Sequence, residues 1–155
     1  MGQASVLNES EIRRVFRIIE TTRHAERNRL CFVLSLYSGL RVGEIAALTI
    51  GDVATQNGDV RREIKLGVHQ TKGSKGCTVI LSERVRKELG SFLKNMTNRD
   101  QGEPLVASQR NGLAFTNVSL SMCCSRKFTN WRGFVHLPTR EDVHLRRDSM
   151  KKGLG

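Results

Sequence analysis

The first fifty residues carry apolar side chains at helical spacing. Over residues 9–20 they recur every three or four positions, which predicts an amphipathic helix. Asn8 and Glu11 at its start are typical of a capping box. After a polar link, residues 25–38 are expected to form a second helix that is apolar in its second half. A short third helix is expected over residues 43–49.

The middle of the chain changes from helical spacing to alternation. Asn57-Gly58 is a strong signal for a hairpin turn. Over residues 64–69 apolar and polar side chains alternate, which predicts a half-exposed strand that includes Val68. Residues 77–81 predict the returning strand. Together these patterns predict a small antiparallel sheet.

Helical spacing returns after the sheet. Ser82 is placed to cap a helix over residues 83–96, and a polar loop then leads to the short apolar segment Leu105-Val106. Beyond residue 122 the periodicity fades. The expected fold class is therefore mainly α with a small antiparallel β-sheet (α+β).

Length and composition favour one ordinary globular domain. A chain of 155 residues with 38% hydrophobic content buries a modest core. No apolar run is long enough to span a bilayer and no signal peptide is recognisable, so a cytoplasmic location is expected. The four cysteines, at positions 31, 77, 123 and 124, lack metal-ligand spacing, so we interpret them as free thiols and expect no metal site.

The net charge of +11 suits a polyanionic partner, of which nucleic acid is the commonest. The excess is unevenly distributed. Residues 123–155 hold eight basic and three acidic residues, a net +5, whereas residues 1–122 hold 18 and 12, a net +6. Almost half of the excess thus lies in the last fifth of the chain, which weakens charge as an indication of DNA binding.

Arg41 lies on a sharp turn between two expected helices. The preceding helix ends in Ser38-Gly39 and the next begins at once, so the arginine is held rigidly near a surface. The stretch Y-S-G-L-R-V-G-E-I over residues 37–45 resembles the first active-site box of the tyrosine recombinases, the phage-type integrases. In that family the arginine binds the scissile DNA phosphate. The resemblance implies this role for Arg41.

A second stretch, Q-T-K-G-S-K-G-C-T-V-I-L over residues 70–81, resembles the family's β-hairpin motif T-K-x-x-K-x-R-x-V-P-L. The first lysine of that motif is the family's mobile catalytic acid. The resemblance therefore implies that Lys72 protonates the leaving oxygen and that Lys75, like Lys72, contacts DNA. Cys77 and Ile80 depart from the family, which commonly has a basic residue and a proline there.

The chemistry of the family explains these residue types. Attack by a tyrosine hydroxyl forms a phosphotyrosyl link and builds negative charge on the phosphate oxygens, which planar guanidinium groups match. A lysine on a flexible hairpin can supply the leaving oxygen with a proton. The covalent link conserves bond energy, so we expect no cofactor, no metal and no small-molecule substrate.

Each motif alone also has a plainer interpretation. A single G-L-R box fits an ordinary helix-turn-helix corner, and a T-K-G-S-K-G turn is usually a solvated hairpin. Their order, with a strand pair between them, favours the family. Two other classes stay open: a non-catalytic DNA-binding module, and a structural or interaction protein with an incidental basic surface. Glu44 is interpreted as a structural partner, and Tyr37, the only tyrosine, as a core residue rather than the nucleophile.

The family's second box, H-x-L/G-R-H/R-T, has only a degraded counterpart in H-L-R-R-D over residues 144–148. His144 stands two residues before Arg146 instead of three. No apolar helix and no further tyrosine follow. At face value, half of the catalytic machinery is missing.

The genetic code offers an explanation for the missing half. Trp131 and Met150 each have a single codon, and back-translation read one base upstream permits L-F-x-x-I-Y-x-L-A-G-F, then S-S-H-S-G-R-R-T-F, then L-x-E-K-G. These strings match a family helix, the second box and the following helix, in order. We therefore expect residues 1–122 to be a partial catalytic domain and residues 123–155 to be an out-of-frame tail. Arg146 is then not the second arginine of the family.

Three expectations follow for the whole chain. No separate core-binding domain precedes the first helix, so the chain is expected to be a fragment at both ends. Without the nucleophile it should not cleave DNA. Its expected partner is double-stranded DNA, bound weakly and in a salt-sensitive way, with self-association on DNA.

Overall fold

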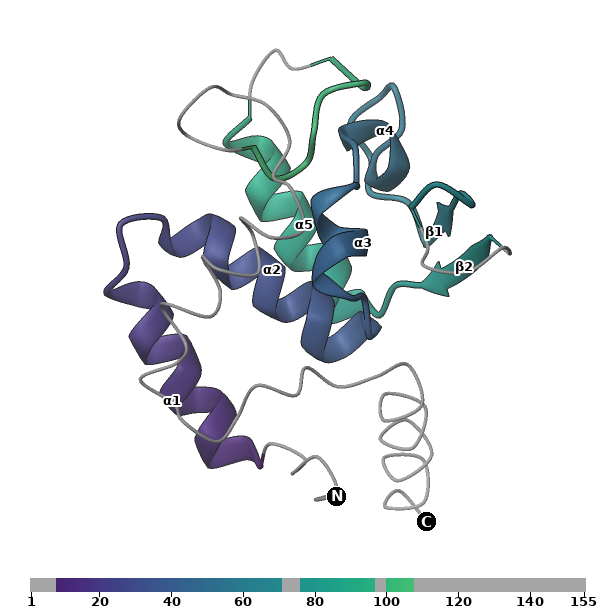
Figure 1. Cartoon of the computed structure of the whole chain (residues 1–155). Coiled ribbons are helices and arrows are strands. Elements are labelled where there is room, and N and C mark those ends of the chain that lie inside the picture. The colour runs from purple at the N-terminus through teal and green to yellow at the C-terminus, as the bar shows by residue number, and fades with distance from the viewer. Residues whose placement is uncertain (1–7, 71–75, 97–99, 108–155) are drawn as a thin grey trace, which may run out of the picture.

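A computed structural model describes residues 8–70, 76–96 and 100–107 of the chain (Figure 1). Within these ranges the fold is mainly helical with a two-stranded antiparallel sheet, which confirms the expected fold class. In chain order the elements are α1 (Glu9–Glu20), α2 (Ala25–Ser38), α3 (Val42–Ala46), α4 (Ile50–Val53), β1 (Glu63–Leu66), β2 (Cys77–Ile80) and α5 (Glu83–Lys94).

Helix α1 begins at the predicted capping box. The Asn8 side chain accepts the backbone N–H of Glu11 at 2.9 Å, and the Glu11 carboxylate accepts that of Asn8 at 2.7 Å. Two amides that the helix leaves without an internal partner are thereby satisfied. The buried face consists of Ile12, Val15 and Ile19, as the apolar spacing predicts.

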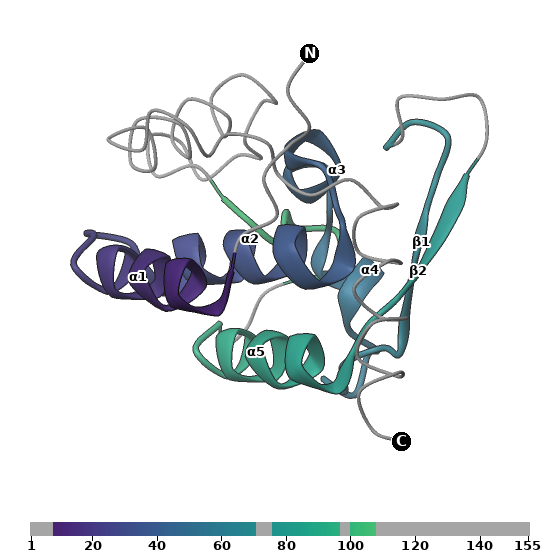
Figure 2. The same cartoon turned by 90° about the horizontal axis from the view of Figure 1, so that it is seen from below.

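Helix α2 is the central element of the described part. It packs against α1, α3 and α5, and in Figure 2 it lies between α3 on one side and α5 on the other. Every residue from Leu30 to Leu36 is buried, so apolar side chains are needed on all sides of this helix and not on one face only. This explains the nearly continuous apolar run in its sequence.

Two hydrophobic clusters meet at α2. The smaller joins α1 to α2, and the larger joins α2 to α3, α4, the sheet, α5 and residues 105–106. Phe16 and Tyr37 pack against both clusters, and the Phe16 ring meets that of Phe32 edge-on at 5.3 Å between centroids. Tyr37 is thus part of the packing between the clusters, in agreement with its interpretation as a core residue.

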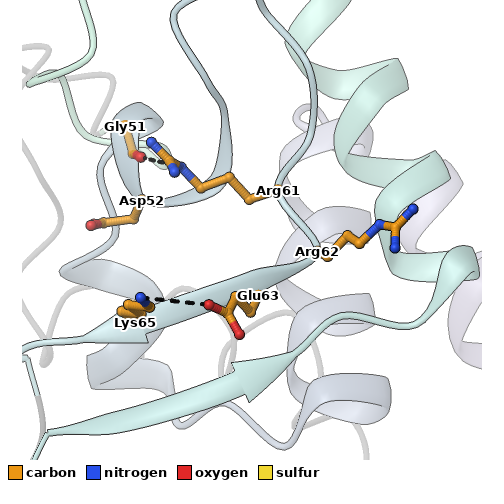
Figure 3. A pocket seen from close by; sticks show the side chains of 6 residues that line it. All are labelled: Gly51, Asp52, Arg61, Arg62, Glu63 and Lys65. Atoms are coloured by element: carbon orange, nitrogen blue, oxygen red, sulfur yellow. Dashed lines mark hydrogen bonds and ion pairs between the residues drawn. The ribbon is translucent and has the colours of Figure 1, made fainter.

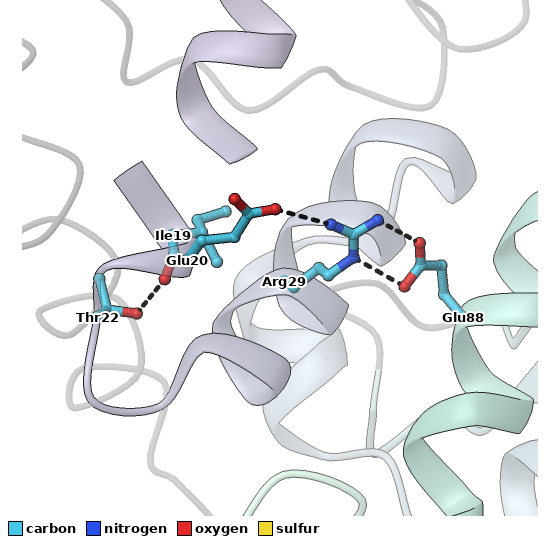
Figure 4. Close-up of polar contacts among 5 residues, drawn as sticks. All are labelled: Ile19, Glu20, Thr22, Arg29 and Glu88. Carbon is cyan, nitrogen blue, oxygen red and sulfur yellow. Dashed lines mark hydrogen bonds and ion pairs between the residues drawn. The ribbon is translucent and has the colours of Figure 1, made fainter. Parts of the chain in front are cut away.

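An arginine on α2 links three helices (Figure 4). The Arg29 guanidinium donates two hydrogen bonds to Glu88 of α5, at 2.7 and 3.0 Å, and lies 3.8 Å from the Glu20 carboxylate of α1. The guanidinium also covers the Phe16 ring at 4.7 Å from its centroid. Hydrogen bonding to Arg29 lowers the pKa of Glu88 below its usual value.

The sheet buries one face. Ile64 pairs with Val79 and Leu66 with Cys77, and these side chains point into the core or toward it. The predicted strand is wrong at its end, because Val68 lies beyond β1 and is 52% exposed. The chain turns after Leu66, where the Gln70 N–H donates a hydrogen bond to the Gly67 carbonyl at 3.0 Å. Alternation of side chains continues past the residue at which pairing stops.

The corner after α3 also differs from the prediction. The expected helix over residues 43–49 ends at Ala46, and a separate short helix, α4, begins after Thr49. The Asp52 carboxylate caps α4 by accepting the Thr49 N–H at 2.8 Å. Leu48 is fully buried, as expected, and its carbonyl accepts the Leu105 N–H at 2.8 Å. Pairing with this distant segment has no local signal in the sequence.

The remaining turn and helix agree with the prediction. Gly58 has φ 85° in the Asn57-Gly58 turn, a conformation that favours glycine. The Ser82 hydroxyl caps α5 by accepting the Val85 N–H, and the helix ends at Lys94, two residues earlier than expected. Leu105 and Val106 are both buried.

Candidate functional site

Arg41 is exposed on the turn between α2 and α3. Gly39 ends α2 in the left-handed region with φ 65°, and the Leu40 N–H reaches back to the Leu34 carbonyl at 3.5 Å. Leu40 is fully buried. Because Leu40 is fixed in the core and Arg41 follows in an extended conformation, the arginine side chain is directed to the surface.

Glu44 fixes the backbone at the same turn. Its carboxylate accepts the Arg41 N–H at 2.9 Å, and the residue is only 5% exposed. Glu44 is therefore a structural partner of the turn, as its sequence position suggested. Among the described residues no carboxylate forms an ion pair with the Arg41 guanidinium.

Lys72 and Lys75 lie outside the described residues, and Gln70 is the last described residue before them. Gln70 donates from its side-chain nitrogen to the Ala47 carbonyl and to the Asp52 carboxylate, both at 3.0 Å. Ala47 is the C-cap of α3, and Arg41 is its N-cap. The side chain of Gln70, two residues before Lys72, is therefore hydrogen-bonded to the opposite end of the helix from Arg41.

A shallow hollow of about 430 Å³ lies beside α4 and β1 (Figure 3). Its lining includes Arg61, Arg62 and Lys65 against Asp52 and Glu63. The cations do not converge on one point, however. The Arg61 guanidinium donates to the Gly51 and Ala54 carbonyls at 3.0 and 3.2 Å.

The other two cations of the hollow are also directed elsewhere. Arg62 points away from Arg61 toward α5 in Figure 3, and the Lys65 amine lies 3.6 Å from Glu63. Neither residue belongs to a motif of the sequence. Arg62 is part of the basic pair Arg61-Arg62 directly before β1, and Lys65 lies on the exposed face of that strand.

Arg84, another exposed arginine, lies beside the last turn of α2. The Arg84 guanidinium, from the first turn of α5, stands over the Tyr37 ring at 4.5 Å from its centroid. Such a contact holds the charge in place without neutralising it. Sequence analysis missed it because the two residues are brought together only by the packing of α5 on α2.

The described residues hold no group of three or more histidine, cysteine or acidic side chains arranged for a metal ion. Within the same residues, no helix combines the length and the apolar character that crossing a bilayer requires.

Comparison with known proteins shows a match to one protein family. The model of the phage integrase family matches residues 5–128 of the sequence. No curated protein matches the sequence.

The described fold is similar to that of several solved structures. The XerA recombinase is 23% identical with a TM-score of 0.65, over 100% of this chain and 52% of that one. The Tn1549 transposon integrase in complex with circular intermediate DNA is 16% identical with a TM-score of 0.66, over 97% and 56%. The same integrase with transposon right end DNA gives 16% and 0.63, over 97% and 55%. At such identities the likeness concerns the fold, and the chain spans about half the length of these structures.

Proposed function

Since this chain belongs to the phage integrase family, we propose that it is part of a site-specific recombinase that breaks and rejoins DNA through a phosphotyrosine. Its partner is double-stranded DNA, and it acts in the cytoplasm, with several copies on one DNA site. The XerA and Tn1549 structures, two of the latter with DNA bound, support this context.

One observation carries the proposal: an exposed arginine with no carboxylate partner in the described part, on a rigid turn. A guanidinium matches two oxygens of one phosphate, and a fixed backbone lowers the entropy lost on binding. Arg41 has this arrangement through the buried neighbours Leu40 and Glu44. Arg41 therefore binds the scissile phosphate in our proposal.

Lys72 is the proton donor in our proposal, and Lys75 a further DNA contact. Lys72 stands two residues after Gln70, and two residues of chain span at most about 7 Å. Gln70 is bonded to the end of α3, a helix of five residues that is about 7.5 Å long. Covalent reach thus allows Lys72 and Arg41 to meet at one phosphate.

Direct measurement of DNA binding tests the role of Arg41. Arg41→Ala should weaken binding about tenfold or more, the order of one charge-assisted hydrogen-bonded contact. It should also reduce the slope of log affinity against log salt by about 0.9. Arg41→Lys should recover the slope but not the whole affinity, because the planar fork is lost.

The matched control is Arg23→Ala, which removes one exposed charge from the link between α1 and α2. If Arg23→Ala and Arg41→Ala weaken binding equally, the phosphate role of Arg41 is wrong. Absence of any salt-dependent DNA affinity in the unmodified chain would favour an interaction protein with an incidental basic surface.

We also propose that residues 123–155 are an out-of-frame product, so that the second arginine, the histidine and the nucleophile of the family are lost. The gene's nucleotide sequence decides this point. Reading the bases before Thr139 and Val143 in the other frame should restore histidine and arginine codons. If it does not, the frameshift proposal is wrong.

A further inference from the structure

We infer that Gln70 is a positioning residue. Its side chain fixes the turn of residues 67–70, which directly precedes the stretch with Lys72 and Lys75, to the corner between α3 and α4. The inference rests on the proposed function for the roles of Arg41 and Lys72, but the anchor itself is formed only by described residues. Its residues are Gln70, Asp52, Thr49 and Ala47.

Both the nitrogen and the oxygen of the Gln70 side-chain amide make hydrogen bonds. Its nitrogen donates to the Ala47 carbonyl and to the Asp52 carboxylate, both at 3.0 Å. Its oxygen accepts the Gly67 N–H at 2.9 Å. An amide offers two donors and one acceptor group, and no other side chain of this length does so.

The acceptor bond closes the turn that precedes the lysine segment. The Gln70 backbone N–H bonds the Gly67 carbonyl at 3.0 Å while the Gln70 side chain accepts the Gly67 N–H. Two hydrogen bonds between Gly67 and Gln70 thereby close the turn of residues 67–70. The two hydrogen bonds that the Gln70 side chain donates to Ala47 and Asp52 then attach this turn to the corner between α3 and α4.

Asp52 connects the attachment to the backbone of the corner. One oxygen of its carboxylate accepts from the Thr49 N–H at 2.8 Å, from the Thr49 hydroxyl at 2.9 Å and from Gln70 at 3.0 Å. The cap of α4 and the anchor of the turn are therefore one hydrogen-bonded group. A carboxylate at position 70 would lie against that of Asp52 and repel it, whereas the amide donates to it.

The anchor has a direct consequence for the proposed chemistry. A proton donor is effective only when it stays within hydrogen-bond reach of the leaving oxygen. In our proposal Gln70 restricts the reach of Lys72, since it fixes the chain two residues before Lys72 to Ala47, the C-cap of the helix whose N-cap is Arg41. Gln70 then acts on the reaction by positioning the backbone and not as a catalytic residue.

Hydrogen exchange of backbone amides in the full chain tests the anchor without DNA. Gln70→Glu keeps the shape and the acceptor but removes both donors and adds repulsion. We expect the amides of residues 67–70 to exchange about tenfold faster, the order expected for the loss of one to two hydrogen bonds. The matched control Gln56→Glu adds the same charge on an exposed turn and should change nothing there.

Exchange of the amide and the carboxylate between positions 70 and 52 shows whether Asp52 is the hydrogen-bond partner of Gln70. The double variant Gln70→Glu with Asp52→Asn again places one amide against one carboxylate. It should recover part of the lost protection. If Gln70→Glu leaves exchange as slow as Gln56→Glu does, or the double variant recovers nothing, the anchor is refuted.

DNA affinity tests whether the anchor acts through Lys72. Gln70→Met removes the hydrogen bonds with no change of charge, and also replaces Gln70→Glu if that variant does not fold. It should weaken DNA binding several-fold in the unmodified chain and have no further effect when Lys72→Ala is present. Additive losses would overturn the positioning role, because Gln70 would then act independently of Lys72.

The two failures are distinguishable. If Lys72→Ala leaves DNA affinity unchanged, the DNA contact expected for Lys72 is wrong and the positioning role, as tested by affinity, falls with it. The exchange experiment decides the anchor in either case, since it contains no DNA.

Discussion

The backbone N–H of Arg41 is bonded to the carboxylate of Glu44 at 2.9 Å, and Glu44 is almost completely removed from solvent. One exposed and one buried side chain therefore share the same turn. The buried one fixes the backbone that presents the exposed one at the surface.

Replacement of Glu44 should reduce stability by weakening the turn. Glu44→Ala removes the acceptor of the partly buried Arg41 N–H, which costs about 1–2 kcal/mol in free energy of unfolding. Glu44→Gln keeps an acceptor and should cost less. Urea unfolding measures both. Glu11→Ala is the control, because it removes the equivalent acceptor at α1 and should reduce stability without reducing DNA affinity.

Replacement of Gly39 should be costly for a backbone reason. Gly39→Ala places a β-carbon in the left-handed region, which costs about 1–2 kcal/mol. Gly102→Ala is the control, since a β-carbon there meets nothing within 4 Å and φ is not positive. Thermal unfolding should show a lower midpoint for Gly39→Ala only. Equal midpoints for the two variants would contradict the assigned conformation.

The Arg29–Glu88 pair should make stability depend on pH in the acid range. The pKa of Glu88 is lowered in the folded protein by its hydrogen bonds to Arg29. The stabilisation is therefore fully present above the unfolded value of about 4.3 and is lost as pH falls through the folded value. Glu88→Gln should flatten the decline of the free energy of unfolding below about pH 5.

At neutral pH, Glu88→Gln should cost about 1–2 kcal/mol, less than for a fully buried pair because both side chains are partly exposed. Glu63→Gln is the control. Its ion pair with Lys65 is exposed and should contribute less than about 0.5 kcal/mol. A Glu88→Gln profile parallel to that of the unmodified chain would contradict the assignment.

A covalent trap tests the proposed loss of the nucleophile. A nicked suicide substrate captures phosphotyrosyl adducts, and this chain should form none, because its single tyrosine, Tyr37, packs between the two clusters under Arg84. The assay is a gel shift that survives denaturation. An adduct that disappears in Tyr37→Phe would show that Tyr37 attacks DNA after all.

Sequence periodicity was sufficient for the elements that bury a regular face. Helices α1 and α2 have the predicted bounds, and α5 differs only at its end. The corner was not predictable in this way. α4 depends on Thr49, Asp52 and the segment near Leu105, whose contacts are not local. Val68 misled the prediction because alternation gives no sign of where pairing ends.

The candidate site was predictable to the same extent. The exposed position of Arg41 could be expected from the sequence, because the glycine that ends α2 and the start of α3 lie directly beside it. The role of Gln70 had no such signal, since its partners Asp52 and Ala47 are 18 and 23 residues away. The positions of Arg41 and Lys72 could thus be singled out from adjacent residues, whereas the contacts of Gln70 appear only in the folded chain.

The burial of Leu40 has a consequence for how such a protein changes over generations. The direction of position 41 is decided by the side chain before it and not by the arginine itself. Folding therefore uses the backbone N–H of residue 41, which Glu44 accepts, and makes little use of its side chain. The arginine can be exchanged for another residue that keeps the N–H with little loss of stability, so position 41 is where a change of selection on the surface would become visible without a change in the fold.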